Sequence, residues 1–154
     1  RLRILSDGGI TFNGDTAQAN ALDDYEEGTW TPTCASASSV SYSNQYGRYT
    51  KVGNCITIWW DLIWTSLSGG NNARIGGLPY TPVVNTNQGG YGIPVFRDAS
   101  GTNSDNRVYG NSSYFLTDGI RLQHYNSSGN PTSGSFNGSG RITGWAQYFD
   151  NNAY

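Results

Sequence analysis

The clearest pattern in the chain is the strict alternation of residues 55–64, which read CITIWWDLIW. Successive side chains of a β-strand point to opposite faces, so this stretch predicts a strand with two different faces. One face is wholly apolar and is expected to lie in the core: Ile56, Ile58, Trp60, Leu62 and Trp64. The other face mixes large apolar groups with a carboxylate: Cys55, Thr57, Trp59, Asp61 and Ile63. That mixture favours a surface partly covered by another subunit and makes Trp59 a candidate subunit or ligand contact, although a second-layer core position is the favoured interpretation for a tryptophan.

Two further stretches carry strand patterns. The sequence YFLTDGIRLQHY predicts a hairpin in which Asp118 and Gly119 supply the positive φ angles of a type I′ turn. The strand that follows is expected to separate Ile120, Leu122 and His124 from the polar row Arg121, Gln123 and Tyr125. On this pattern His124 is interpreted as a hydrogen-bonded core or interface histidine. Residues 141–149 alternate in the same way and predict a long strand integral to the sheet.

Short apolar stretches separated by Gly, Asn, Ser and Pro recur about every dozen residues, and helical periodicity is nearly absent. The pattern predicts an all-β fold, specifically an antiparallel, jelly-roll-like β-sandwich. Only residues 16–27, TAQANALDDYEE, have the composition for a helical turn. Their acidic end disfavours the C-terminal dipole of such a helix, so this segment is expected to be a connector.

Composition narrows the class of function. Charged residues make up 13% of the 154 residues, against about 25% in an average soluble domain, whereas aromatic residues reach 14%. So many aromatic side chains exclude a disordered chain. The net charge of −2 and the single lysine, Lys51, give no basic stripe, so a nucleic-acid partner is not expected. No apolar run has membrane-spanning length, so membrane insertion is not expected either.

The cysteine and histidine content limits covalent and metal chemistry. Cys34 and Cys55 are the only cysteines, and two lone thiols are commonly buried and inert, although a bridge between them stays open. Because His124 is the only histidine, one chain cannot build a His/Cys zinc cluster. The sequence therefore predicts neither a metal nor a cofactor.

Four segments, in this order, resemble the C-terminal region of bacteriophage tail-fibre and tailspike proteins. They are GDTAQANALDDYEEGTWTPT (14–33), QYGRYTKVGNCITIWW (45–60), ARIGGLPYTP (73–82) and GRITGWAQYF (140–149). The resemblance implies a homotrimer in the virion, assembled in the host bacterial cytoplasm together with other phage tail or fibre proteins. It divides the chain into the end of a fibre shaft with its connector, residues 1–27, and a receptor-binding head, residues 28–154. The opening RLRILSDGGITFNGD looks like the last shaft strand, and the chain, which lacks a starting Met, is expected to be a piece of a longer fibre.

The stretches between these segments are expected to recognise the host. Loops 66–73, 85–92, 97–107 and 126–140 are rich in Asn, Ser, Gly and Tyr, a mixture that antibody loops use for adaptable binding and that suits a cell-surface glycan. The predicted glycan-binding residues are Tyr91, Arg97, Asp98, Asn106, Arg107 and Tyr109. A strand of only three residues, PVF (94–96), would bring their two loops together. If these residues belong to the core, the binding site is expected around Phe136. The alternative is that the loop residues only form turns and bind nothing.

Two other functions remain open beside the adhesin. A depolymerase needs two carboxylates roughly 5 to 10 Å apart, and Asp98 with Asp105 is the only loop pair. The dense acidic group Asp23, Asp24, Glu26 and Glu27 lies in the connector, so catalysis is not expected. A purely structural trimerisation knob would need only the core and would expose no aromatic side chain beside the polar loops.

Overall fold

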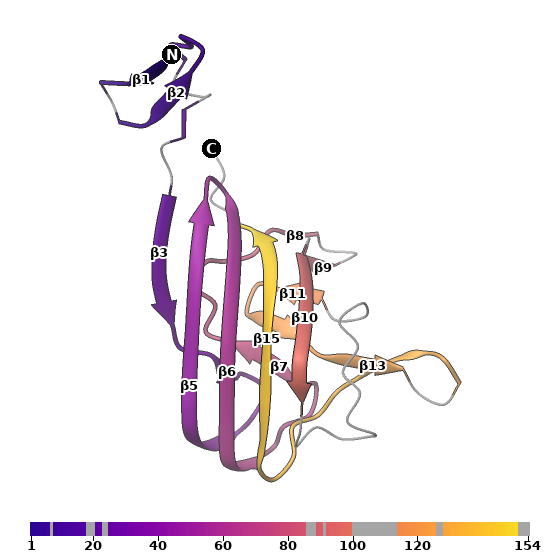
Figure 1. Cartoon of the computed structure of the whole chain (residues 1–154). Coiled ribbons are helices and arrows are strands. Elements are labelled where there is room, and N and C mark those ends of the chain that lie inside the picture. Colours follow the sequence, from indigo (N-terminus) through magenta and orange to yellow (C-terminus); the bar gives the residue numbers. More distant parts are fainter. Residues whose placement is uncertain are drawn as a thin grey trace.

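Figure 1 shows the computed structural model of the chain. It describes residues 1–6, 8–17, 21–22, 25–85, 89–90, 92–99, 114–125 and 128–150. Within these ranges, only the backbone is described for residues 85, 89–90, 92–99, 114 and 124–125. Every regular element in these described ranges is a β-strand, and all strand pairs are antiparallel. The prediction of an all-β fold is confirmed.

Most strands belong to two sheets. The five-stranded sheet has the order β10–β15–β6–β5–β3. Its members are β3 (Tyr25–Trp30), β5 (Ser39–Val52), β6 (Cys55–Ser68), β10 (Gly92–Ala99) and β15 (Gly140–Phe149). The six-stranded sheet has the order β4–β7–β12–β11–β9–β8. Its members are β4 (Thr33–Cys34), β7 (Arg74–Gly76), β8 (Val84–Asn85), β9 (Gly89–Gly90), β11 (Tyr114–Leu116) and β12 (Gly119–Arg121).

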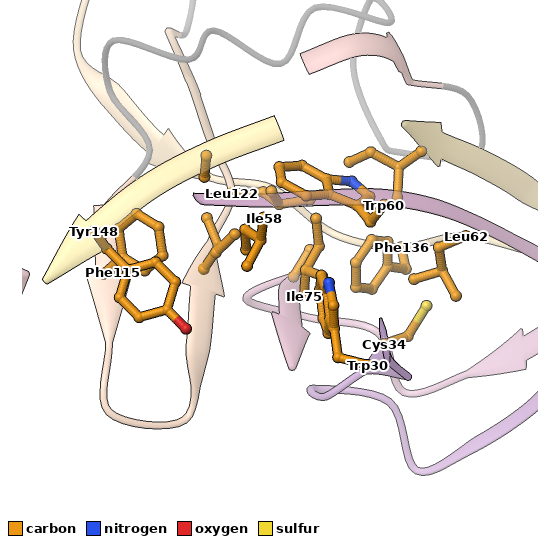
Figure 2. Packing of buried hydrophobic residues seen from close by; sticks show 14 of the residues in the cluster. Trp30, Cys34, Ile58, Trp60, Leu62, Ile75, Phe115, Leu122, Phe136 and Tyr148 are labelled. Carbon is orange, nitrogen blue, oxygen red and sulfur yellow. The ribbon is translucent and has the colours of Figure 1, made fainter. Parts of the chain in front are cut away.

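The hydrophobic core draws on both sheets. The apolar face predicted for residues 55–64 is confirmed, because Ile56, Ile58 and Leu62 are fully buried and Trp60 and Trp64 nearly so. The strand predicted for 141–149 is also confirmed as β15, which pairs with β6 along its whole length. Figure 2 shows Ile58, Trp60 and Leu62 of β6 in one cluster with Ile75 and Phe115 of the second sheet. There Phe115 of β11 packs on Tyr148 of β15, with ring centroids 4.8 Å apart.

At the β3 edge of the five-stranded sheet, large aromatic side chains lie over glycines of the neighbouring strand. Trp30 stands opposite Gly47 in the register and donates its indole N–H to the carbonyls of Arg48 and Trp59, at 3.1 and 3.2 Å. A Cβ on Gly47 would lie 2.5 Å from that indole nitrogen. Tyr49 covers Gly28 in the same way. Because Gly47 has no side chain, the indole of Trp30 can reach across β5 to the carbonyl of Trp59 on β6.

The predicted hairpin exists, but its turn differs from the prediction. Leu116 pairs with Gly119, so the two loop residues are Thr117 and Asp118, and among the three only Gly119 has a positive φ. The type I′ assignment to Asp118 and Gly119 is wrong. The carboxylate of Asp118 forms an ion pair with Arg74 on β7, an interaction that the sequence pattern did not contain.

The strand predicted after this turn is also interrupted. Leu122 leaves the ladder, donates its N–H to the carbonyl of Ala73 at 2.9 Å and is fully buried. The following β13 (Gln123–Tyr125) pairs with β14 (Pro131–Ser133) in a separate two-stranded sheet. Arg121 binds Asn72 and Ser133, and the side chain of His124 lies outside the described part.

The N-terminal stretch forms a hairpin where a single shaft strand was predicted. β1 (Leu2–Ile4) pairs with β2 (Ile10–Phe12), and Gly8 and Gly9 turn the chain with φ angles of 92° and 84°. In Figure 1 this hairpin lies apart from the two main sheets. Its large apolar side chains are exposed: Leu2, Ile4 and Phe12. Residues 25–27 of the predicted connector belong to β3, and the expected boundary at residues 27 and 28 stays a prediction.

The contact between Trp30 and Gly47 leads to a stability prediction. Gly47→Ala places a methyl group inside the indole of Trp30, so the free energy of unfolding should fall by about 1 to 3 kcal/mol, as overpacking typically costs. Gly134→Ala is the control, because its Cβ would meet Leu122 at an ordinary 3.4 Å, and it should stay within about 1 kcal/mol of the parent. Urea unfolding measures both, and equal stabilities would contradict the packing at Gly47.

Candidate functional site

The outer face of the five-stranded sheet, the side turned away from the core, carries two exposed tryptophans. The register places Thr29, Arg48, Trp59 and Trp145 in one row across β3, β5, β6 and β15. Trp59 is 45% exposed and Trp145 41%, whereas the other tryptophans are buried. Directly opposite residues of an antiparallel pair have Cβ atoms about 5 Å apart. The two indoles therefore form one exposed aromatic surface, named here the tryptophan platform.

A groove lies beside this platform, over β3, β5 and β6. Its volume is about 580 Å³, within the size range of small-molecule sites. It is lined by Glu27, Gly28, Thr29, Arg48, Tyr49, Thr50 and Trp59. Since Glu27 stands opposite Thr50 and Arg48 stands opposite Trp59, the groove brings a carboxylate, a guanidinium, hydroxyls and an indole together.

The two charged groups of the groove differ in their contacts. The carboxylate of Glu27 accepts a hydrogen bond from the hydroxyl of Tyr25. The guanidinium of Arg48, which is exposed, makes no hydrogen bond or ion pair with any residue that the structure describes. Its backbone carbonyl is fixed by the indole of Trp30. Arg48 therefore stands at a defined position in the sheet with its charged group facing solvent.

A tyrosine cluster fixes β3 beneath the groove. The carboxylate of Glu26 accepts hydrogen bonds from the hydroxyls of Tyr49 and Tyr80, the latter at 2.6 Å. The two tyrosine rings meet edge to face at 5.6 Å, and the ammonium of Lys51 lies 5.0 Å from the Tyr80 ring. The hydrogen bonds to Glu26 raise the pKa of both tyrosines. At neutral pH both hydroxyls are therefore protonated donors that tie β3, β5 and the Tyr80 loop together.

Two other regions of the outer face flank the groove and platform. On one side Arg141 binds Asp61 through two hydrogen bonds of 2.9 and 3.1 Å. Toward the other end of the sheet lies a row without charges, named here the apolar end row. It consists of Tyr25, Val52, Cys55 and Phe149, which the register places side by side. Tyr25, Val52 and Phe149 are exposed.

The structure does not describe the side chains of the glycan-binding residues predicted in the loops. Tyr91, Asn106, Arg107 and Tyr109 lie outside the described residues. Arg97 and Asp98 belong to β10 beside a register shift, and only their backbone is described.

The strand length behind that loop prediction is wrong. The supposed three-residue strand 94–96 is part of the 8-residue strand β10, which at about 3.3 Å per residue spans roughly 26 Å. Gly92 and Ala99 therefore lie at its opposite ends, and Arg97 and Asp98 lie within the strand. Phe136, the centre of the fallback site, is 2% exposed and packs on Trp64 with ring centroids 5.1 Å apart, so its own ring belongs to the core.

Sequence reasoning found one part of the outer-face site and missed the rest. Trp59 was named as a candidate subunit or ligand contact, which stays a prediction; the second-layer core position that the sequence favoured for it is wrong because it is 45% exposed. Trp145 lies on the predicted strand 141–149, where it alternates with buried residues. That alternation indicated that its side chain lies on the outer face. Glu27 and Arg48 become neighbours only through strand pairing, which one sequence does not reveal.

The described residues offer few groups for covalent or metal chemistry. Cys34 and Cys55 are free thiols, and burial raises the pKa of the Cys34 thiol to about 12. Within the described ranges, no group of His, Cys, Asp and Glu side chains is arranged to hold a metal ion. The same ranges contain no helix long and apolar enough to cross a membrane.

The chain was compared with protein-family models, with curated proteins and with solved structures. No family model, curated protein or solved structure matches it. The interpretation of the site therefore depends on its own geometry and on the sequence resemblance.

The two thiols should differ in reactivity. A thiol reacts as the thiolate, so the buried Cys34 with its raised pKa should resist N-ethylmaleimide at mildly alkaline pH. Cys55 is only partly buried within one chain, so it should be modified first in dilute, monomeric protein. Peptide mass spectrometry of samples taken over time measures both rates, and unfolding in guanidinium chloride should make them equal. Equal rates in the native protein would contradict the burial of Cys34.

Proposed function

We propose that this chain is the receptor-binding tip of a bacteriophage tail fibre or tailspike and that it binds a host cell-surface glycan without cleaving it. In this proposal residues 28–154 form a jelly-roll-like β-sandwich head, and the chain acts as a homotrimer in the virion. The sequence resemblance supports the class of protein. The exposed tryptophan platform beside a polar groove supports the function.

That one observation carries the proposal because it matches the chemistry of sugars. A pyranose has apolar C–H faces, which pack on aromatic rings, and hydroxyls, which need hydrogen-bond donors and acceptors. Trp59 and Trp145 provide exposed rings, and Arg48 and Glu27 provide a donor and an acceptor beside them. A stable head requires none of these exposed rings, since the core is built from the opposite face of the same strands.

The two alternatives fit the outer face less well. A purely structural knob would carry Tyr46, Trp59 and Trp145 on one face only if neighbouring copies covered them. A depolymerase needs two positioned carboxylates. Of those described on this face, Asp61 is ion-paired with Arg141 and Glu27 accepts a hydrogen bond from Tyr25. This arrangement favours binding over hydrolysis.

The trimer contact is assigned to the apolar surfaces at the N-terminal end of the molecule. A two-stranded hairpin is marginally stable alone in water, and β1–β2 exposes Leu2, Ile4 and Phe12. The apolar end row adds Tyr25, Val52 and Phe149 on the main sheet. Packing of three copies would bury these groups and leave the tryptophan platform open, and three weak sites on one tip would then act together through high local concentration.

Trp59→Ala and Trp145→Ala should each abolish adsorption of the isolated tip to host cells. Each removes an aromatic surface worth about 1 kcal/mol beyond its buried area, multiplied over three sites. Melting temperatures should hardly change, because surface substitutions usually alter stability by less than about 0.5 kcal/mol. Fluorescently labelled protein on whole cells measures adsorption, with Thr117→Ala on the β11–β12 turn as the control.

Tyr91→Ala and Tyr109→Ala test the loop patch in the same assay. If these two variants lose adsorption and both tryptophan variants keep it, the binding site lies in the loops. If the unchanged tip binds neither whole cells nor their purified polysaccharide, the adhesin proposal fails altogether.

The trimer should depend on the exposed apolar side chains of the hairpin. The triple substitution Leu2→Ser, Ile4→Ser and Phe12→Ser removes the apolar groups that association would bury, so the mass in solution should fall from trimer to monomer. Tyr46→Ser, on the outer face away from these surfaces, should leave the trimer intact. Light scattering at micromolar concentration measures the mass, and a monomeric parent protein would contradict the assignment.

A further inference from the structure

We propose, building on the glycan-binding function, that the β3–β5–β6 groove is a subsite for a neutral pyranose. The apolar face of the sugar packs on Trp59, and neighbouring hydroxyls bind the guanidinium of Arg48 and the carboxylate of Glu27. Trp145 extends the aromatic surface for the next ring of the saccharide.

The position of Trp59 distinguishes it from the buried tryptophans. Trp60 and Trp64 are buried in the core, and Trp30 and Trp64 donate their indole N–H groups to backbone carbonyls. Trp59 instead faces solvent between the groove and Trp145. Its ring is therefore available as a platform, and its backbone is fixed by the hydrogen bond from Trp30.

The charges of the groove select a neutral sugar. Glu27 and Arg48 are its only carboxylate and guanidinium, so their formal charges cancel. A sugar hydroxyl both donates and accepts, and two adjacent hydroxyls can use the guanidinium as donor and the carboxylate as acceptor. The carboxylate of an acidic sugar would be attracted by the guanidinium of Arg48 but repelled by the like charge of Glu27.

Other charges on the outer face do not alter this balance. Asp61 and Arg141, the neighbouring pair, compensate each other through their two hydrogen bonds. Lys51 and Glu26 stand opposite each other on the inner side of β5 and β3. The groove therefore offers an acidic saccharide no excess positive charge.

The groove borders the surface assigned to the trimer, since its Glu27 accepts a hydrogen bond from Tyr25 of the apolar end row. Trp59 and Arg48 lie further away, because their row and the row of Cys55 differ by four positions along β6, or roughly 13 Å at the rise of a β-strand. A neighbouring copy on the apolar end row can therefore leave Trp59 and Arg48 accessible. A polar groove with balanced charges is also a poor contact for an apolar subunit surface.

Titration of the trimeric protein with defined saccharides tests the subsite. The neutral probes are maltohexaose, isomaltohexaose and mannohexaose, and the acidic probe is hexagalacturonate. In nitrogen–proton spectra the indole signal of Trp59 should move with at least one neutral probe. The signals of Trp30 and Trp64, whose N–H groups are bonded to carbonyls, should stay in place.

Variants then assign the roles of the two charged groups. Arg48→Gln and Glu27→Gln should each weaken binding of the neutral probe by about tenfold or more, as expected for a lost hydrogen bond to a charged group. Arg141→Gln is the matched control on the same face and should change the affinity less than about twofold, since it lies outside the groove. Melting curves of all variants show whether the fold is kept.

Each outcome decides a separate point. Stronger binding of hexagalacturonate than of the neutral probes, or groove variants that bind like the parent, overturns the subsite and leaves glycan binding itself standing. Failure of the parent to bind any neutral probe also overturns the subsite. Failure to bind both the probes and the host polysaccharide overturns the adhesin proposal with it.

Discussion

The antiparallel pairing of β6 with β5 on one side and β15 on the other determines both the core and the candidate site. Strand alternation sends Ile58 and Trp60 inward and therefore sends Trp59 outward. The same register brings Arg48 and Trp145 to either side of Trp59. Core and candidate site are thus opposite faces of the same three strands, and a register shift of one residue would exchange them.

Glycine makes this arrangement possible on the crowded inner face. Gly47 and Gly144 flank Trp60 in the register, and Gly47 also lies under the indole of Trp30. Trp30 then reaches the carbonyls of Arg48 and Trp59, the residues that carry the outer-face site. The core at the β3 edge therefore fixes the backbone beneath the groove, which links stability to the geometry of the proposed binding surface.

The sequence could predict what alternation determines and could not predict what strand pairing determines. The two faces of β6, the strand β15 and the all-β class follow from local periodicity. The break at Leu122 and the turn at Thr117 and Asp118 depend on contacts with Ala73 and Arg74, which are distant in the sequence. For the same reason the site was sought in polar loops: the pairing of Glu27 and Arg48 with neighbours on other strands leaves no local signal.

In the proposed function the sugar lies on the tryptophan platform and not in the loops. Nuclear Overhauser contacts between protons of a bound host oligosaccharide and the aromatic rings of the protein measure this most directly. We expect contacts from the sugar C–H protons to the indoles of Trp59 and Trp145. Contacts confined to Tyr91 and Tyr109, with none to either tryptophan, would contradict it.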